Sequence, residues 1–449
     1  MKRKIYNKLL EWKNQWQGKS ALLIDGARRV GKSWIAEEFA KNEYRTHIII
    51  DFNDVRSEIL DIFNNHLFDL DQFFSLLSFT TGVQLYPRES IIVFDEVQLF
   101  PQARAALKYL VADGRYDFIE TGSLVSINHN VKDIMIPSEE VRIEMHPMDF
   151  EEFLWALDMG NRFEYVRERF SQRKPLEASA HRIMIELLRT YMLVGGMPQG
   201  VLEYVESRNF RIVDEIKRNI INLYSNDISK YAGRQVANVR AVFDNIPGAL
   251  GKHARRFRPS AIKKGARMRT FTEAMFWLDE SRVVNFCYGV NEPSVGFNLT
   301  KEDGKVKIYM ADTGLLVSMI FPVGHDTDEI YRKIMLGKLE FNKGMIVENL
   351  VAQQLRSNGH PLFFFSTSSR EDANDTMEID FLIQKPKITS RHNVIPIEVK
   401  STNRYSISSL EKFRRKFERN VDQPIVLHTG ELKEADGILY LPLYMAAFL

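Results

Sequence analysis

Eight consecutive residues near the N-terminus have the types and spacing of a phosphate-binding loop. They fit G-x-x-x-x-G-K-S/T and lie between an apolar run, Ala21–Asp25, and a helical stretch at 34–40. Glycines let successive backbone N–H groups point at the β-phosphate, and the helix N-terminus adds partial positive charge. The lysine would reach the β- and γ-phosphate oxygens of ATP, and the serine hydroxyl would complete a Mg²⁺ shell. The eight residues are Gly26, Ala27, Arg28, Arg29, Val30, Gly31, Lys32 and Ser33.

Two carboxylates, Asp95 and Glu96, follow a second buried apolar run. We expect Asp95 to hold Mg²⁺ through water and Glu96 to polarise a hydrolytic water against the γ-phosphate. An acidic pair there favours hydrolysis over phosphoryl transfer to a bound acceptor, so an ATPase is preferred to a kinase. The next strand ends in Thr121-Gly122-Ser123. A hydroxyl of Ser123 or Thr121 is the candidate that senses the γ-phosphate.

A basic segment at 252–269 contains eight Lys or Arg and no acid. Clustered cations gain affinity for nucleic acid by releasing counterions from phosphates. Short helices followed by extended runs around Gly304 predict a winged helix-turn-helix, which places a helix in a major groove. A solvated face or a subunit interface stays open as the alternative. The eight cations are Lys252, Arg255, Arg256, Arg258, Lys263, Lys264, Arg267 and Arg269.

Four residues of the C-terminal part form a second chemical constellation. Asp380 and Glu398 lie on successive predicted strands, and alternation places Glu398 and Lys400 on one face. Two such carboxylates can hold Mg²⁺, and a lysine beside them can orient an attacking water. Glu348, on the apolar stripe of a helix predicted at 341–357, needs a partner or a cation. If Lys400 alone offsets the repulsion between the carboxylates of Asp380 and Glu398, the cluster is an inert ion pair.

The order of elements that must position these residues indicates an α/β multidomain fold. In the first 150 residues, near-continuous apolar runs alternate with helical stretches, as in a parallel sheet buried on both faces. Residues 150–231 are helical in pattern. The pattern of the C-terminal part predicts a helix, three strands, a second helix and further strands, in that order.

Composition excludes several classes of protein. The 449 residues are 45% apolar, with Lys+Arg 61 against Asp+Glu 59, which rules out disordered, collagen-like and disulfide-scaffold chains. The single Cys287 forms no intrachain disulfide and fits a reducing compartment. No apolar window reaches the length of a membrane helix. We therefore expect a cytoplasmic protein with no membrane partner.

The motifs resemble those of AAA+-type P-loop ATPases. The resemblance rests on residues 26–33, 94–98, 120–123, 146–154 and 195–198. More closely, the chain is similar to a bacterial and archaeal group with a C-terminal PD-(D/E)xK nuclease-like domain, although Ile379 stands where the name-giving motif has proline. The resemblance also makes Arg142 a candidate arginine finger, with an ordinary strand-edge charge as the alternative.

The resemblance implies a P-loop NTPase parallel sheet with four further parts. The expected limits are 1–155 for the ATPase core, 156–235 for a helical lid, 236–320 for the winged-helix-like basic segment, 321–340 for a connector and 341–449 for the nuclease-like domain.

The expected function is ATP binding and hydrolysis coupled to action on DNA. Catalytic roles fall to Glu96, Glu348, Asp380, Glu398 and Lys400, and metal ligation to Ser33, Asp95, Asp380 and Glu398. Two alternatives remain: a nucleotide-dependent regulatory switch, and a protein remodeller. In both, the nuclease-like domain is only a binding module. A homo-oligomer also stays open.

Overall fold

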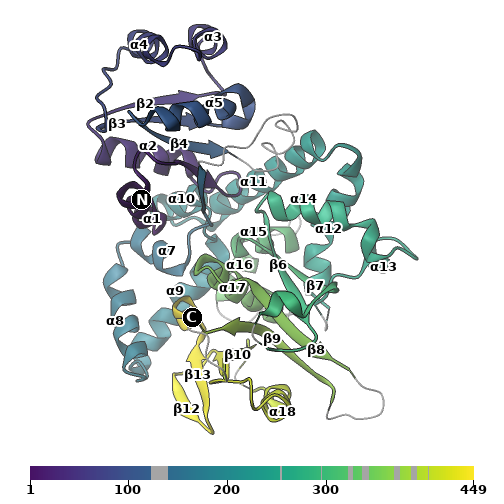
Figure 1. Ribbon diagram of the computed structural model, residues 1–449. Coiled ribbons are helices and arrows are strands. Elements are labelled where there is room, and N and C mark those ends of the chain that lie inside the picture. The colour runs from purple at the N-terminus through teal and green to yellow at the C-terminus, as the bar shows by residue number, and fades with distance from the viewer. Residues whose placement is uncertain are drawn as a thin grey trace. The chain divides into compact units, whose positions relative to one another are not determined.

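The computed structural model describes residues 1–122, 140–252, 255–294, 296–321, 327–335, 343–368, 375–385, 392–402 and 404–449. Contacts divide the chain into two compact units, Met1–His146 and Pro147–Leu449, each with its own sheet (Figure 1). No helix in these ranges is long and apolar enough to cross a membrane.

The first unit is built on five parallel strands in the order β2-β3-β4-β1-β5. β1, β3 and β4 are buried at every position, which explains their unbroken apolar runs. The predicted parallel sheet is therefore confirmed. The strands are β1 (Ala21–Asp25), β2 (Thr46–Asp51), β3 (Ser90–Asp95), β4 (Asp117–Gly122) and β5 (Glu140–Glu144). The helices are α1 (Ile5–Trp16), α2 (Lys32–Glu43), α3 (Ser57–Asn65), α4 (Leu70–Thr81) and α5 (Pro101–Asp113).

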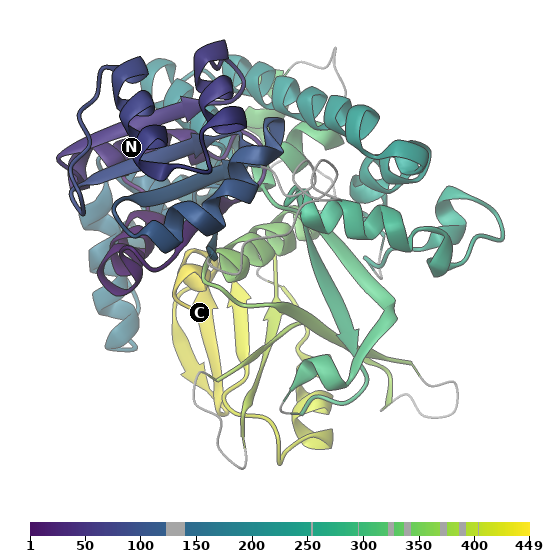
Figure 2. The ribbon, with the colours of Figure 1, turned by 45° about the horizontal axis from the view of Figure 1, so that its top comes forward.

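The second unit carries a mixed eight-stranded sheet in the order β12-β13-β11-β10-β9-β8-β6-β7. Figure 2 follows it from the yellow C-terminal strands to the blue-green β6 and β7. The strands are β6 (Val284–Val290), β7 (Lys301–Met310), β8 (Leu362–Thr367), β9 (Met377–Gln384), β10 (Val394–Val399), β11 (Ile425–His428), β12 (Lys433–Ala435) and β13 (Ile438–Pro442).

The helices of the second unit that are named here fall before and between these strands. They are α7 (Phe150–Ala156), α8 (Gly160–Ser171), α9 (Ala178–Val194), α10 (Pro198–Ser207), α11 (Phe210–Tyr231), α12 (Val236–Leu250), α13 (Pro259–Ile262), α14 (Thr272–Glu280), α15 (Thr313–Ile320), α16 (Thr327–Met335), α17 (Lys343–Ser357) and α18 (Ser408–Lys416). α7 begins with a capping box, in which Asp149 and Glu152 bond each other's backbone N–H.

The β6–β7 hairpin, expected as a wing, belongs to the same sheet as the C-terminal strands. β6 pairs with β7 antiparallel and with β8 parallel, for example Cys287 with Leu362. The sheet thus joins the predicted segments 236–320 and 341–449. The helix–three strands–helix–strand order expected for the latter appears as α17, β8, β9, β10, α18 and β11.

A fully buried lysine on α11 organises the helices of the second unit. Lys217 Nζ donates to the carbonyl oxygens of Leu193 (2.6 Å) and Gly314 (3.3 Å) and to the hydroxyl oxygen of Tyr331 (2.8 Å). Its three hydrogens therefore reach the end of α9, the start of α15 and α16. All the N–H donors of this buried ammonium are satisfied, as burial of a charge requires.

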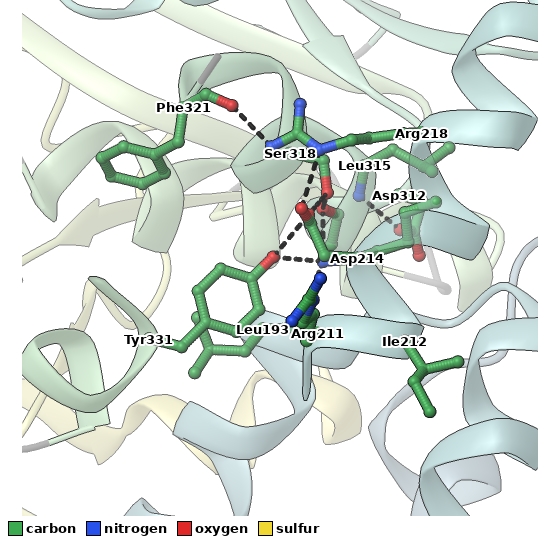
Figure 3. Close-up of polar contacts among 12 residues, drawn as sticks. Leu193, Arg211, Ile212, Asp214, Arg218, Asp312, Leu315, Ser318, Phe321 and Tyr331 are labelled. Carbon is green, nitrogen blue, oxygen red and sulfur yellow. Dashed lines mark hydrogen bonds and ion pairs between the residues drawn. The ribbon is translucent and has the colours of Figure 1, made fainter. Parts of the chain in front are cut away.

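Asp214, one turn before Lys217, completes this network (Figure 3). Its carboxylate accepts from Ser318 Oγ at 2.6 Å, Tyr331 OH at 2.8 Å and Arg218 Nε at 2.7 Å. One aspartate and one lysine thus tie four helices together through hydrogen bonds across long sequence separations.

We expect Lys217 to make stability depend on pH. Burial lowers the pKa of Lys217 from 10.5 to about 8. Between these values the unfolded chain binds more protons than the folded chain, so the free energy of unfolding should rise with pH. The expected gain from this group between about pH 7.5 and about pH 9.5 is about 2 kcal/mol.

Urea unfolding of the unmodified chain, of Lys217→Met and of Lys230→Met at both pH values checks this. Lys230 is an exposed lysine on the same helix and serves as the control. Lys217→Met should lose the rise and Lys230→Met should keep it. Equal pH dependence in the two variants would show that Lys217 is not the titrating group.

Candidate functional site: a nucleotide-binding loop and an acidic cluster

The loop between β1 and α2 has the backbone shape that a phosphate requires. Gly31, at the N-terminal end of α2, is left-handed with φ +97°, and a Cβ on Gly26 would lie 2.4 Å from the carbonyl oxygen of Met145. The first turn of α2 receives no side-chain capping hydrogen bond from its N-cap residue, Gly31. Its backbone N–H groups are therefore placed to bind an anion.

Lys32 is buried with only neutral hydrogen-bond partners. Its Nζ donates to the carbonyl oxygens of Gly26 (2.9 Å) and Ala27 (3.1 Å), and its side chain is 6% exposed. Burial lowers the pKa of Lys32, whereas the charges of Glu96, Asp25 and Asp95 act in the opposite direction. A phosphate in the loop would give this ammonium a charged hydrogen-bond partner, so these residues fit a nucleotide.

Thr121 joins the two predicted acidic residues. The hydroxyl of this fully buried residue donates to Asp95 Oδ1 and accepts from the backbone N–H of Glu96 at 3.3 Å. Glu96 has φ +54° at the end of β3 and accepts a hydrogen bond from Gln98 Nε2. Ser123, the other hydroxyl candidate, lies outside the described residues. The described hydroxyl at this strand end is thus Thr121.

Arg142 is already bound within its own unit. Its Nη2 lies 2.5 Å from Oδ2 of Asp25, the fully buried last residue of β1. Neighbouring strands bring the two residues together, since Asp25 pairs with Glu144 in the parallel register of β1 and β5. The role of Arg142 as an arginine finger stays a prediction.

Arg3 is a residue of this site that sequence reasoning missed. It is 6% exposed and donates from Nη1 to the carbonyl of Val30 at 2.9 Å and from Nη2 to the carbonyl of His146 at 2.6 Å. It braces the phosphate loop against the segment after β5. The basic N-terminus carried no spacing signal that pointed to this contact.

Replacing Thr121 with valine should slow ATP turnover while nucleotide affinity changes little. The variant keeps the shape of the side chain but removes the hydrogen bond that orients Asp95. A hydrogen bond to a charged group is worth about 1.5–3 kcal/mol, so we expect kcat to fall at least about tenfold. Thr121→Ser, which retains the hydroxyl, should stay near the unmodified rate. Equal rates for the valine and serine variants would exclude the hydroxyl from this role.

The structure brings the four predicted C-terminal residues into one neighbourhood. β9 and β10 pair antiparallel, and Asp380 Oδ2 accepts the backbone N–H of Val399 at 2.8 Å. Glu398 forms an ion pair with Lys400, and burial, then the nearby charge of Asp380, raise the pKa of Glu398 to about 7. Glu348 on α17 is fully buried.

Four further charged residues of this neighbourhood were missed. Lys307 Nζ lies 3.1 Å from Glu348 Oε1 and 3.0 Å from Glu378 Oε1, and Arg255 forms an ion pair with Glu348. Arg256 Nη2 lies 3.3 Å from Glu378 Oε2. The basic segment therefore directs two of its eight cations inward. The absence of acids around 252–269 pointed to DNA, to solvent or to a subunit interface, and not to acidic partners within the chain.

Comparisons with family models assign three parts of the chain. Residues 18–154 match a family described as AAA domain, residues 185–326 match Domain of unknown function (DUF8612), and residues 343–445 match Domain of unknown function (DUF4143). No curated protein matches the chain. The N-terminal part of the chain is thus an AAA-type P-loop ATPase domain, as predicted. The winged-helix and nuclease-like identities stay predictions.

Solved structures show a more distant likeness. The Walker-type ATPase PABY2304 of Pyrococcus abyssi is 16% identical, with 72% of this chain and 96% of that chain covered and a TM-score of 0.42. The Aeropyrum pernix ORC1 protein in complex with DNA is 11% identical, with 71% and 92% covered and a TM-score of 0.28. Cdc6p from Pyrobaculum aerophilum is 12% identical, with 76% and 96% covered and a TM-score of 0.26. These TM-scores are below 0.5 and support no functional assignment.

Proposed function

We propose that the chain hydrolyses ATP in the presence of Mg²⁺ and uses this cycle to act on DNA. The observation that carries the ATPase part is the hydrogen-bonded group of Asp95, Thr121 and Glu96 beside the buried Lys32 in the AAA-type domain. Lys32 would bind the β- and γ-phosphates. Ser33 and Asp95 would hold Mg²⁺, which when bound neutralises phosphate charge. Glu96 would take up the proton of the attacking water.

The DNA part is supported by exposed cations in the basic segment. Arg255 and Arg256 face acidic partners, whereas the remaining six cations are exposed. The exposed six are Lys252, Arg258, Lys263, Lys264, Arg267 and Arg269. They lie between α12 and α14, ahead of the β6–β7 hairpin, in the order expected of a winged helix-turn-helix.

A second candidate is a nucleotide-dependent switch or remodeller whose C-terminal region is only a binding module. The observation that favours it is the pairing of the C-terminal carboxylates with cations of the same chain, Lys307 and Arg255 among them. Cleavage of DNA by Asp380, Glu398 and Lys400, with Glu348, is the alternative that this pairing opposes.

Glu96→Gln should bind ATP normally and turn it over at least about a hundredfold more slowly, because the amide cannot accept the proton of the attacking water. Lys32→Ala should instead lose nucleotide binding. Glu89→Gln, an exposed glutamate just before β3, is the matched control. Phosphate release and fluorescent-nucleotide titration measure the two properties. Turnover by Glu96→Gln near the unmodified rate would remove Glu96 from its assigned role.

Affinity for duplex DNA should fall steeply with salt, with a log–log slope of about −0.9 per phosphate neutralised. Replacing Lys263 and Lys264 with alanine should flatten the slope by about two units if each contacts one phosphate. Lys8→Ala with Lys19→Ala removes two exposed lysines from the other unit as a control. An equal slope in the two double variants would contradict phosphate contacts by Lys263 and Lys264. It would favour a subunit interface as the role of the basic segment.

A further inference from the structure

Eight charged side chains of the second unit form one cluster with equal numbers of each sign. The cluster lies where β7, β8, β9 and β10 meet α17 and the segment after α12. The carboxylates are Glu348, Glu378, Asp380 and Glu398, and the cations are Arg255, Arg256, Lys307 and Lys400. The formal charge of the group is four minus four, or zero.

Lys307 occupies the centre of this cluster. Its Nζ is fully buried and lies 3.1 Å from Glu348 Oε1, 3.0 Å from Glu378 Oε1 and 3.8 Å from Asp380 Oδ1. One ammonium therefore faces three carboxylates on α17 and β9. It sits at the point from which a shared cation would reach all three.

Arg255 approaches two of the same three carboxylates. Its guanidinium forms an ion pair with Glu348 and lies 4.0 Å from Asp380 Oδ1. The following residues hold this segment in place: Arg256 binds Ser366 and Glu378, and the backbone N–H of buried Phe257 donates to the carbonyl of Val306 at 2.9 Å. Arg255 is thus anchored to β7 and β8.

This arrangement does not fit a divalent metal. Mg²⁺ demands oxygen ligands at about 2.0–2.1 Å in near-octahedral geometry. Among the described residues, no group of three or more His, Cys, Asp or Glu side chains is arranged to hold a metal ion. A dication placed here would meet Lys307 and Arg255 and would give a neutral cluster an excess of positive charge.

We propose that Lys307 and Arg255 are permanent counter-ions that replace a metal in this acidic site. The cluster then binds no divalent ion and instead joins the β6–β7 hairpin and the segment after α12 to the C-terminal strands. The proposal deepens the binding-module candidate for the C-terminal region. It is independent of the ATPase proposal, because neither residue belongs to the nucleotide site.

Mn²⁺ binding to the nucleotide-free full chain, counted by electron paramagnetic resonance of the free ion, tests the replacement. The unmodified chain should bind no Mn²⁺ at this cluster. Asp380→Asn should therefore leave the amount of bound Mn²⁺ unchanged. Lys307→Met should gain such a site, with affinity at least tenfold above the unmodified chain, and Lys307→Met with Asp380→Asn should lose it. Lys305→Met, a paired lysine on the same strand, should gain none. Mn²⁺ binding in the unmodified chain that depends on Asp380 would overturn the proposal, as would a folded Lys307→Met protein that binds no Mn²⁺.

A double-mutant cycle keeps the proposal testable if Lys307→Met folds poorly. Removing Lys307 takes one cationic partner from buried Glu348 and should lower the urea midpoint of unfolding. Adding Glu348→Gln to Lys307→Met should restore most of that decrease. Losses that simply add would contradict a mutual counter-ion role. Arg255 lies at the partly exposed edge of the cluster, and Arg255→Met should also gain Asp380-dependent Mn²⁺ binding. If it does not, Arg255 is not one of the cations that replace a metal.

Discussion

A lysine ammonium taken out of water must find oxygen partners inside the protein, and this constraint recurs at each organising centre of the chain. Lys32, Lys217 and Lys307 are 6%, 0% and 0% exposed. The cost of burying a charge is large unless hydrogen bonds or opposite charges surround it. The kind of partner that surrounds each lysine therefore separates a ligand site from a structural one.

The three lysines differ in what their partners leave unsatisfied. Lys217 has three acceptors for its three hydrogens, with Asp214 nearby, so its position serves packing between helices. Lys307 faces three carboxylates and is compensated by charge. Lys32 donates only to two carbonyl oxygens of its own loop, next to an uncapped helix N-terminus. It is the lysine whose environment favours an incoming phosphate.

Ion pairs also divide the basic segment into two roles. Arg255 and Arg256 are turned toward Glu348 and Glu378, and Phe257 fastens them to β7. The cations that follow remain exposed and free to meet a polyanion. The same run of charge thus supplies internal counter-ions at one end and a candidate DNA surface at the other, which whole-segment charge counting does not distinguish.

The phosphate loop, the acids at the end of β3 and the parallel sheet were predictable from the sequence, because each depends on neighbouring residues. Glycine spacing sets the loop, and unbroken apolar runs mark strands buried on both faces. Only the tertiary structure placed Arg3 against Val30, brought the hydroxyl of Thr121 to Asp95, and set Lys307 among Glu348, Glu378 and Asp380. The last group depends on β6 pairing with β8, and strand order across a long separation in sequence is decided by the packing of the whole sheet rather than by any local pattern.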